Sequence, residues 1–116
     1  MMARLINKQN DQVIAANVMK AESFRQRLVG LLGHSHLDSD STLWIARCNS
    51  IHTWFMRFAI DVVFVDKQLK IQSIHKNVRP WRMTLPKRSA DSVFEFAAGT
   101  LEPFDLKQGD QLDVAD

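Results

Sequence analysis

Residues 58–65 form an almost entirely apolar run that contains a single charged side chain, Asp61. Such a run is typical of a central β-strand that is covered on both faces of its sheet. Because side chains alternate along a strand, one face of the run carries the predicted core, which is Met56, Phe58, Ile60, Val62 and Phe64. Arg57, Ala59 and Asp61 share the opposite face.

Shorter runs indicate further strands around this central one, at 3–6, 12–19, 43–48, 69–74, 92–98 and 111–114. Lys67 and Gln68 can turn the central strand into a hairpin with residues 69–74. An apolar face formed by Phe24, Leu28, Leu31 and Leu32 predicts one short helix that begins near Ser23 and ends at Gly33. Residues 100–106 have room for a helical turn. The predicted fold class is α+β, mainly β, with an antiparallel barrel-like sheet and the short helix packed against it.

The length and composition indicate one domain over residues 1–116. The chain has 116 residues, of which 46% are hydrophobic, and this is enough for a single core. No stretch approaches the roughly 20 apolar residues of a membrane span, and residues 1–10 lack the apolar centre of a signal peptide. The single cysteine, Cys48, excludes an internal disulfide and fits a reducing compartment. A cytoplasmic protein is the expectation.

The charge is divided between two neighbouring segments. Residues 67–90 contain seven basic and no acidic residues, and residues 91–116 contain seven acidic residues and one lysine. One interpretation is that the two segments lie side by side and neutralise each other. The other is a basic patch that attracts an anion.

Several polar residues occur within the apolar stretch 48–66, and the candidate ligand-binding residues are among them: His52, Thr53, Arg57 and Asp61. Polar groups in such surroundings need hydrogen-bond partners or are exposed for use. On a regular strand the α-carbons of Arg57 and Asp61 are about 13 Å apart, so a direct ion pair is not expected. The competing structural interpretation is that Asp61 accepts backbone N–H bonds and Arg57 braces a loop.

His52 is the residue in this stretch that can act as an acid or base near neutral pH. The sequence contains no Ser-His-Asp arrangement or carboxylate pair that specifies a reaction, so no catalytic residue is assigned. Cys48 is interpreted as a small apolar residue. The potential metal ligands are His34, His36, Cys48, His52 and His75, and they lack the paired spacing of a zinc site. No metal and no cofactor is predicted.

The basic loop of residues 76–91 contains a second cluster, Arg79-Pro80-Trp81-Arg82. Arginine forks suit phosphate or carboxylate groups, so Arg79, Trp81 and Arg82 are added to the candidate ligand-binding residues. Nucleic acid is disfavoured as a partner, because one basic loop is not a basic surface. The structural alternative is that Trp81 covers the edge of the core, with the arginine side chains extended past it.

A longer pattern resembles a known family. It is Cys48-x-x-Ile51-His52-Thr53-x-x-Met56-Arg57-Phe58-x-Ile60-Asp61-Val62-x-Phe64, followed by Pro80-Trp81-Arg82. This pattern resembles the bacterial and archaeal family called domain of unknown function 192, over about residues 20–114. The resemblance implies a small barrel-like β domain with a helix, and the family has no established reaction or ligand. Many relatives carry an export signal, which residues 1–10 do not show.

Three functional interpretations follow from these residues. The first is a domain that binds a small anionic molecule or a protein partner, with Arg57, Arg79 and Arg82 attracting the anion and His52, Thr53 and Asp61 orienting it. The second is a hydrolase or transferase that uses His52 as acid and base. The third is an interaction module of a larger assembly that makes contact through the basic loop at 76–88.

Overall fold

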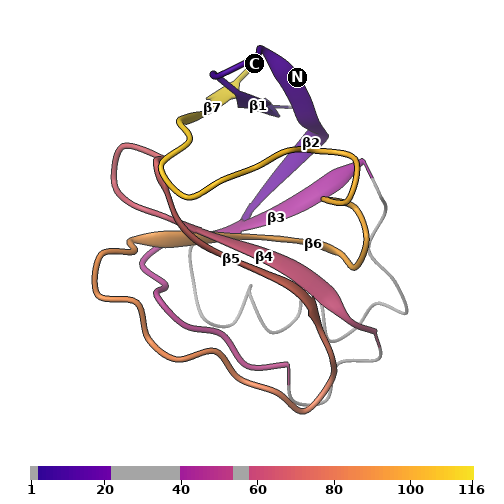
Figure 1. Ribbon diagram of the computed structural model, residues 1–116, viewed down its shortest axis with the longest axis vertical. Coiled ribbons are helices and arrows are strands. Elements are labelled where there is room, and N and C mark those ends of the chain that lie inside the picture. Colours follow the sequence, from indigo (N-terminus) through magenta and orange to yellow (C-terminus); the bar gives the residue numbers. More distant parts are fainter. Residues whose placement is uncertain (1–2, 22–39, 54–57) are drawn as a thin grey trace.

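Figure 1 shows a computed structural model of the chain, which describes residues 3–21, 40–53 and 58–116. These residues form seven strands: β1 (Ala3–Asn7), β2 (Gln12–Ala21), β3 (Ser41–Ile45), β4 (Ile60–Val65), β5 (Ile71–Val78), β6 (Ser92–Ala97) and β7 (Leu112–Ala115). No helix occurs within the described ranges. The helix predicted from Ser23 to Gly33 lies outside them.

All seven strands belong to one sheet, in the order β5-β4-β6-β3-β2-β1-β7. Five of its six neighbouring pairs are antiparallel, and β2 with β3 is parallel, with Asn17 opposite Ser41 and Ala21 opposite Ile45. The prediction of an antiparallel sheet is therefore wrong for this pair. Parallel neighbours need a long connection between them, and the chain between Ala21 and Ser41 is long enough to supply one.

The sheet curls into a half-barrel, and its two edge strands approach each other at one end (Figure 1). Lys70, just before β5, forms an isolated bridge with Gln111, just before β7. The Ile71 N–H donates to the Asp110 carbonyl at 2.9 Å, and the Leu112 N–H donates to the Leu69 carbonyl at 2.9 Å. The barrel-like, mainly β part of the prediction is confirmed, and among the described residues the two edge strands are joined at this end.

In the part of the chain that the structure describes, the core consists of two apolar clusters, and β4 contributes to both. Ile60, Val62 and Phe64 belong to one cluster, and Val63 and Val65 belong to the other. Every residue of β4 is buried, as the apolar run predicted for a central strand. Asp61 has the parity of the second cluster and therefore lies on a face that is itself core.

Strand β5 is longer than predicted and is bulged near its end. Ile60 pairs with Val78 whereas Val62 pairs with His75, so β5 carries one extra residue between these pairs. Within this β-bulge Asn77 has a φ of 55°, a left-handed conformation that asparagine tolerates better than most residues. Residues 76–78, which were predicted as loop, therefore belong to the strand.

Candidate functional site

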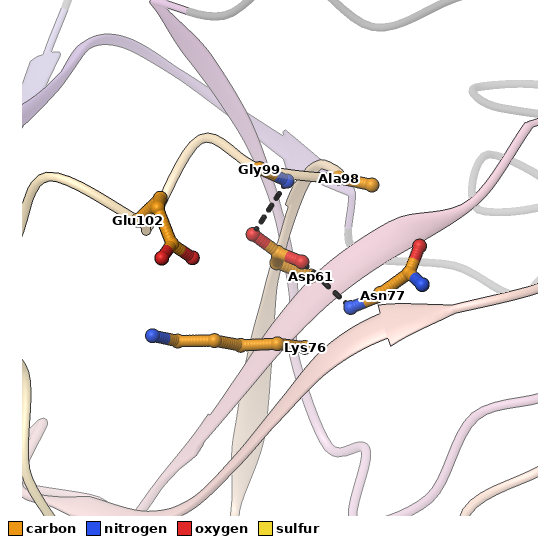
Figure 2. A pocket seen from close by; sticks show the side chains of 6 residues that line it. All are labelled: Asp61, Lys76, Asn77, Ala98, Gly99 and Glu102. Carbon is orange, nitrogen blue, oxygen red and sulfur yellow. Dashed lines mark hydrogen bonds between the residues drawn. The ribbon is translucent and has the colours of Figure 1, made fainter.

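The carboxylate of Asp61 is buried, with 1% of the residue exposed, and it accepts three backbone hydrogen bonds. The Asn77 N–H donates to Oδ1 at 2.8 Å. The N–H groups of Gly99 and Leu101 donate to Oδ2 at 3.1 and 3.3 Å. Figure 2 shows the carboxylate between Asn77 and Gly99. The interpretation that Asp61 accepts backbone N–H bonds therefore matches the observed geometry.

The donors after β6 are presented by consecutive turns. The Thr100 N–H bonds to the Ala97 carbonyl at 3.0 Å, and the Glu102 N–H bonds to the Gly99 carbonyl at 3.1 Å. Gly99 has a φ of 89°, which a residue without Cβ adopts at no steric cost. Residues 97–104 form turns where a helical turn was predicted over 100–106, and these turns aim two N–H groups at Asp61.

A small pocket of about 310 Å³ opens beside this carboxylate, and we call it the Asp61 pocket. Its lining residues come from β4, the β5 bulge and the turns after β6: Asp61, Lys76, Asn77, Ala98, Gly99 and Glu102 (Figure 2). The lining contains two carboxylates and one ammonium group. Because the Asp61 carboxylate already accepts three N–H bonds, little of its acceptor capacity remains for a ligand.

A larger pocket of about 460 Å³ also borders the bulge, and we call it the basic pocket. Its lining residues run along the end of β5 and into the following loop: His75, Lys76, Asn77, Val78, Arg79 and Arg82. None of these lining residues is acidic. Lys76 and Asn77 line both pockets, so the bulge borders a mixed-charge pocket and a cationic one.

Thr53 fixes the loop that carries Arg79 and Arg82. Its hydroxyl is buried, donates to the Arg79 carbonyl at 2.5 Å, and accepts from the Arg82 N–H at 2.9 Å. The Thr53 N–H donates to the Arg82 carbonyl at 2.8 Å, and the Trp81 N–H donates to the Thr53 carbonyl at 3.1 Å. Thr53 thus anchors the loop through its backbone, and its hydroxyl is engaged in hydrogen bonds to backbone groups.

His52 and Cys48 also serve local structure. His52 is half-buried and forms an antiparallel bridge with Met83. Cys48 is buried in the first apolar cluster, and its thiol donates to the Ser50 carbonyl at 2.9 Å. Neither residue lines the two pockets described above. Within residues 3–21, 40–53 and 58–116, no three His, Cys, Asp or Glu side chains are grouped so that they could hold a metal ion. His34 and His36 lie outside these ranges.

The predicted site residues thus separate into groups. Asp61 lines the Asp61 pocket, and Arg79 and Arg82 line the basic pocket. His52 and Thr53 line neither pocket and pair with the backbone of the loop that follows β5. The remaining residues contribute differently: Trp81 is 58% exposed and lines neither pocket, and Arg57 lies outside the described residues.

Five residues that line the Asp61 pocket were not predicted as site residues from the sequence: Lys76, Asn77, Ala98, Gly99 and Glu102. The same holds for His75 and Val78 of the basic pocket. Lys76 belongs to the basic segment 67–90, and Gly99 directly follows the predicted strand at 92–98, so each has a weak signal in the sequence. Asn77 and Glu102 had none, because only the folded chain brings them beside Asp61.

In the described parts of the chain, no helix is long and apolar enough to cross a bilayer.

These features define a class of protein: a small, mainly β domain with a curled seven-stranded sheet and a backbone-capped aspartate at its open end. The chain belongs to the DUF192 family, described as "Uncharacterized ACR", whose profile matches residues 5–114. The family resemblance found in the sequence is confirmed.

Relatives and solved structures agree with this assignment. A UPF0127 protein of Thermococcus sibiricus is 32% identical over 113 residues, which are 94% of this chain and 73% of the relative. A UPF0127 protein of Pyrococcus horikoshii is 28% identical and is covered over 96% of its length, with 93% of this chain. A crystal structure from Sinorhizobium meliloti 1021, described as a candidate transcription regulator, aligns with a TM-score of 0.81 at 23% identity, over 97% of this chain and 91% of the other. At that identity the likeness establishes the fold alone.

Proposed function

We propose that this domain binds a small anionic ligand that carries a phosphate or carboxylate group, in the basic pocket. The observation that supports this most directly is the lining of that pocket, which contains Lys76, Arg79 and Arg82 and, among the described residues, no acidic side chain. All three cationic residues are exposed. A concave site lined by several cationic side chains concentrates anions and holds them by charge-assisted hydrogen bonds.

The surrounding residues support the proposal by fixing where these cations lie. Arg79 follows β5 directly and Arg82 lies in the same loop, and the Thr53 hydroxyl bonds to the backbone of both residues. Asp61 holds the bulge through the Asn77 N–H, next to Lys76. A preorganised site loses less side-chain and loop entropy on binding. In this proposal Thr53 and Asp61 position the cations, and the two arginines contact the ligand.

The proposal is tested by titrating the protein with inorganic phosphate and with citrate in a calorimeter. The double variant Arg79→Gln/Arg82→Gln removes two cations from the pocket, and we expect at least about a tenfold loss of affinity. The matched control is Lys87→Gln/Arg88→Gln, which removes two exposed cations from the same loop outside the pocket lining.

Two results would contradict the proposal. One is a wild-type protein that shows no binding of either anion. The other is an equal loss of affinity in both double variants, because this would indicate diffuse attraction by the basic segment and no defined pocket. A circular dichroism spectrum of each variant establishes that the fold is retained.

A hydrolase or transferase that uses His52 receives less support. His52 lines neither pocket, and its backbone forms a bridge with Met83 of the loop. A general acid or base needs to reach the reacting group within hydrogen-bond distance or through one water. A phosphate-releasing activity that disappears in His52→Ala, with phosphate binding retained, would favour this alternative over simple binding.

A further inference from the structure

The loop after β5 exposes an unusual group of apolar side chains. Trp81, Met83 and Leu85, which we call the apolar triplet, are 58%, 63% and 84% exposed. The other large apolar side chains that the structure gives as exposed are Val13 and Met19, at 40% and 38%. Three such side chains within five residues form a patch, whereas scattered exposed apolar residues are ordinary.

The backbone under the triplet is held firmly. Thr84 lies between Met83 and Leu85 and is buried, and its hydroxyl accepts the Ile51 N–H at 3.0 Å. The Thr84 N–H donates to the Ile51 carbonyl at 2.9 Å. Trp81 has a φ of 65°, a conformation that is unfavourable for a bulky side chain. The triplet is therefore displayed by a segment that is anchored on its other side.

The surroundings of the triplet are cationic. Arg79, Arg82, Lys87 and Arg88 are all exposed, and residues 67–90 contain no acidic side chain. The loop lies at the end of the molecule opposite the two termini (Figure 1). A binding partner that complements this loop must present negatively charged groups to the cations and an apolar region to the triplet.

From this combination we propose that residues 79–88 dock on the surface of a bilayer that contains anionic lipids, with the apolar triplet inserted at the headgroup boundary. Cationic side chains bind the anionic headgroups, while Trp, Met and Leu bury apolar area at the interface. Nucleic acid fits the loop less well, because Met83 and Leu85 have no aromatic face for base stacking. The inference rests on the triplet and on the cations around it. Arg79 and Arg82 also line the basic pocket, but the docking does not require a ligand in that pocket.

The direct test is co-sedimentation of the protein with vesicles. We expect binding to mixed phosphatidylcholine–phosphatidylglycerol vesicles, weaker binding at high salt, and little binding to pure phosphatidylcholine. No sedimentation with the mixed vesicles would overturn the proposal, and so would equal binding to both vesicle types. A loop that instead retained a duplex oligonucleotide and ignored the vesicles would also overturn it.

The contribution of the apolar side chains is tested with Trp81→Ser/Met83→Ser/Leu85→Ser. We expect partitioning onto the mixed vesicles to fall by about tenfold or more, because three apolar side chains no longer insert. The matched control is Val13→Ser/Met19→Ser, which removes exposed apolar area from β2 and should leave partitioning unchanged. If the triple variant does not fold, Leu85→Ser alone provides the test, since Leu85 is 84% exposed. Wild-type partitioning in the folded variant would overturn the proposal.

The contribution of charge is tested with Lys87→Gln/Arg88→Gln, for which we expect a loss on the order of tenfold. Its control is Arg4→Gln/Lys8→Gln, two exposed cations on and beside β1. Phosphate titration of the triple serine variant separates this inference from the proposed function, because loss of vesicle binding should leave phosphate affinity unchanged. Equal vesicle binding by both charge variants would count against a defined docking face.

Discussion

Asp61 carries the one charge within β4, and the folded chain compensates that charge with backbone dipoles. Its two carboxylate oxygens receive N–H groups from the β5 bulge and from the turns after β6. A buried carboxylate without such partners is strongly unfavourable. The same three bonds join segments that are far apart in sequence, so Asp61 stabilises the shape of the open end of the half-barrel.

Replacing Asp61 with Asn should therefore reduce the free energy of unfolding by about 2–4 kcal/mol. The asparagine side chain has one acceptor oxygen, whereas both carboxylate oxygens of Asp61 accept backbone N–H bonds. In the variant the NH₂ group would therefore face a backbone N–H that has lost its acceptor. Urea unfolding followed by circular dichroism measures the loss. Asp105→Asn is the control, because Asp105 is an exposed partner of Lys107 and should contribute little. Equal midpoints for wild type and Asp61→Asn would contradict this role.

The burial of Asp61 could be predicted from its position in an apolar run, and so could its need for N–H donors. The identity of the donors could not. Gly99 and Leu101 lie 38 and 40 residues further along the chain, and no local pattern specifies a contact over that separation. For the same reason Thr53 was predicted as a ligand-binding residue, although its hydroxyl bonds to the backbone of Arg79 and Arg82.

Among the elements, the bulge in β5 has the largest effect on the candidate site. Its extra residue turns the Asn77 N–H toward Asp61 and places Lys76 and Asn77 in the lining of both pockets. Bulges commonly redirect a side chain next to a functional site. The cationic character of the larger pocket thus depends on backbone geometry as well as on the basic residues themselves.

The left-handed conformation of Asn77 gives a prediction at this scale. Asn77→Val places a β-branched residue at a φ of 55° and should lower stability by about 1–2 kcal/mol. It should also weaken phosphate binding, because the bulge shifts. Asn77→Gly keeps the conformation and should stay within about 0.5 kcal/mol of wild type. Thermal unfolding and phosphate titration measure both effects, and identical behaviour of the two variants would argue against the bulge.

The strands themselves were largely predictable, because their apolar alternation is local. The hairpin of β4 with β5 was predicted from Lys67 and Gln68 and is present. The extension of β5 through residues 76–78 was not predicted, because that segment lacks an apolar alternation of its own. It is a strand because it pairs with β4, and that pairing is a tertiary contact. Parallel pairing of β2 with β3 was missed as well, because strand order depends on tertiary packing. The predicted helix lies outside the described residues.

For the whole molecule, closure of the half-barrel depends on β7. Leu112 is buried in the second apolar cluster, and its N–H bonds to the Leu69 carbonyl beside β5. The same strand pairs with β1 on its other side. The residue therefore joins the two edges of the sheet.

Leu112→Ala should consequently lower the free energy of unfolding by about 2–5 kcal/mol, through lost burial and the cavity that remains. The same substitution at Leu85, which is 84% exposed, serves as the control and should change stability by less than about 0.5 kcal/mol. Chemical denaturation of the two variants provides the comparison. Similar losses in both would show that β7 contributes no more than a surface loop.

The pairing of β1 with β7 also has a consequence for how the chain reaches this structure. Arg4 lies opposite Ala115 and Leu5 opposite Val114, so this ladder joins the most distant strands in the sequence. Contacts of such separation require a large loop to close and are expected to form slowly. Until they form, β1 presents an open edge to which another copy of the chain can add. Refolding yield should therefore fall as protein concentration rises, even for variants whose folded state is as stable as the wild type.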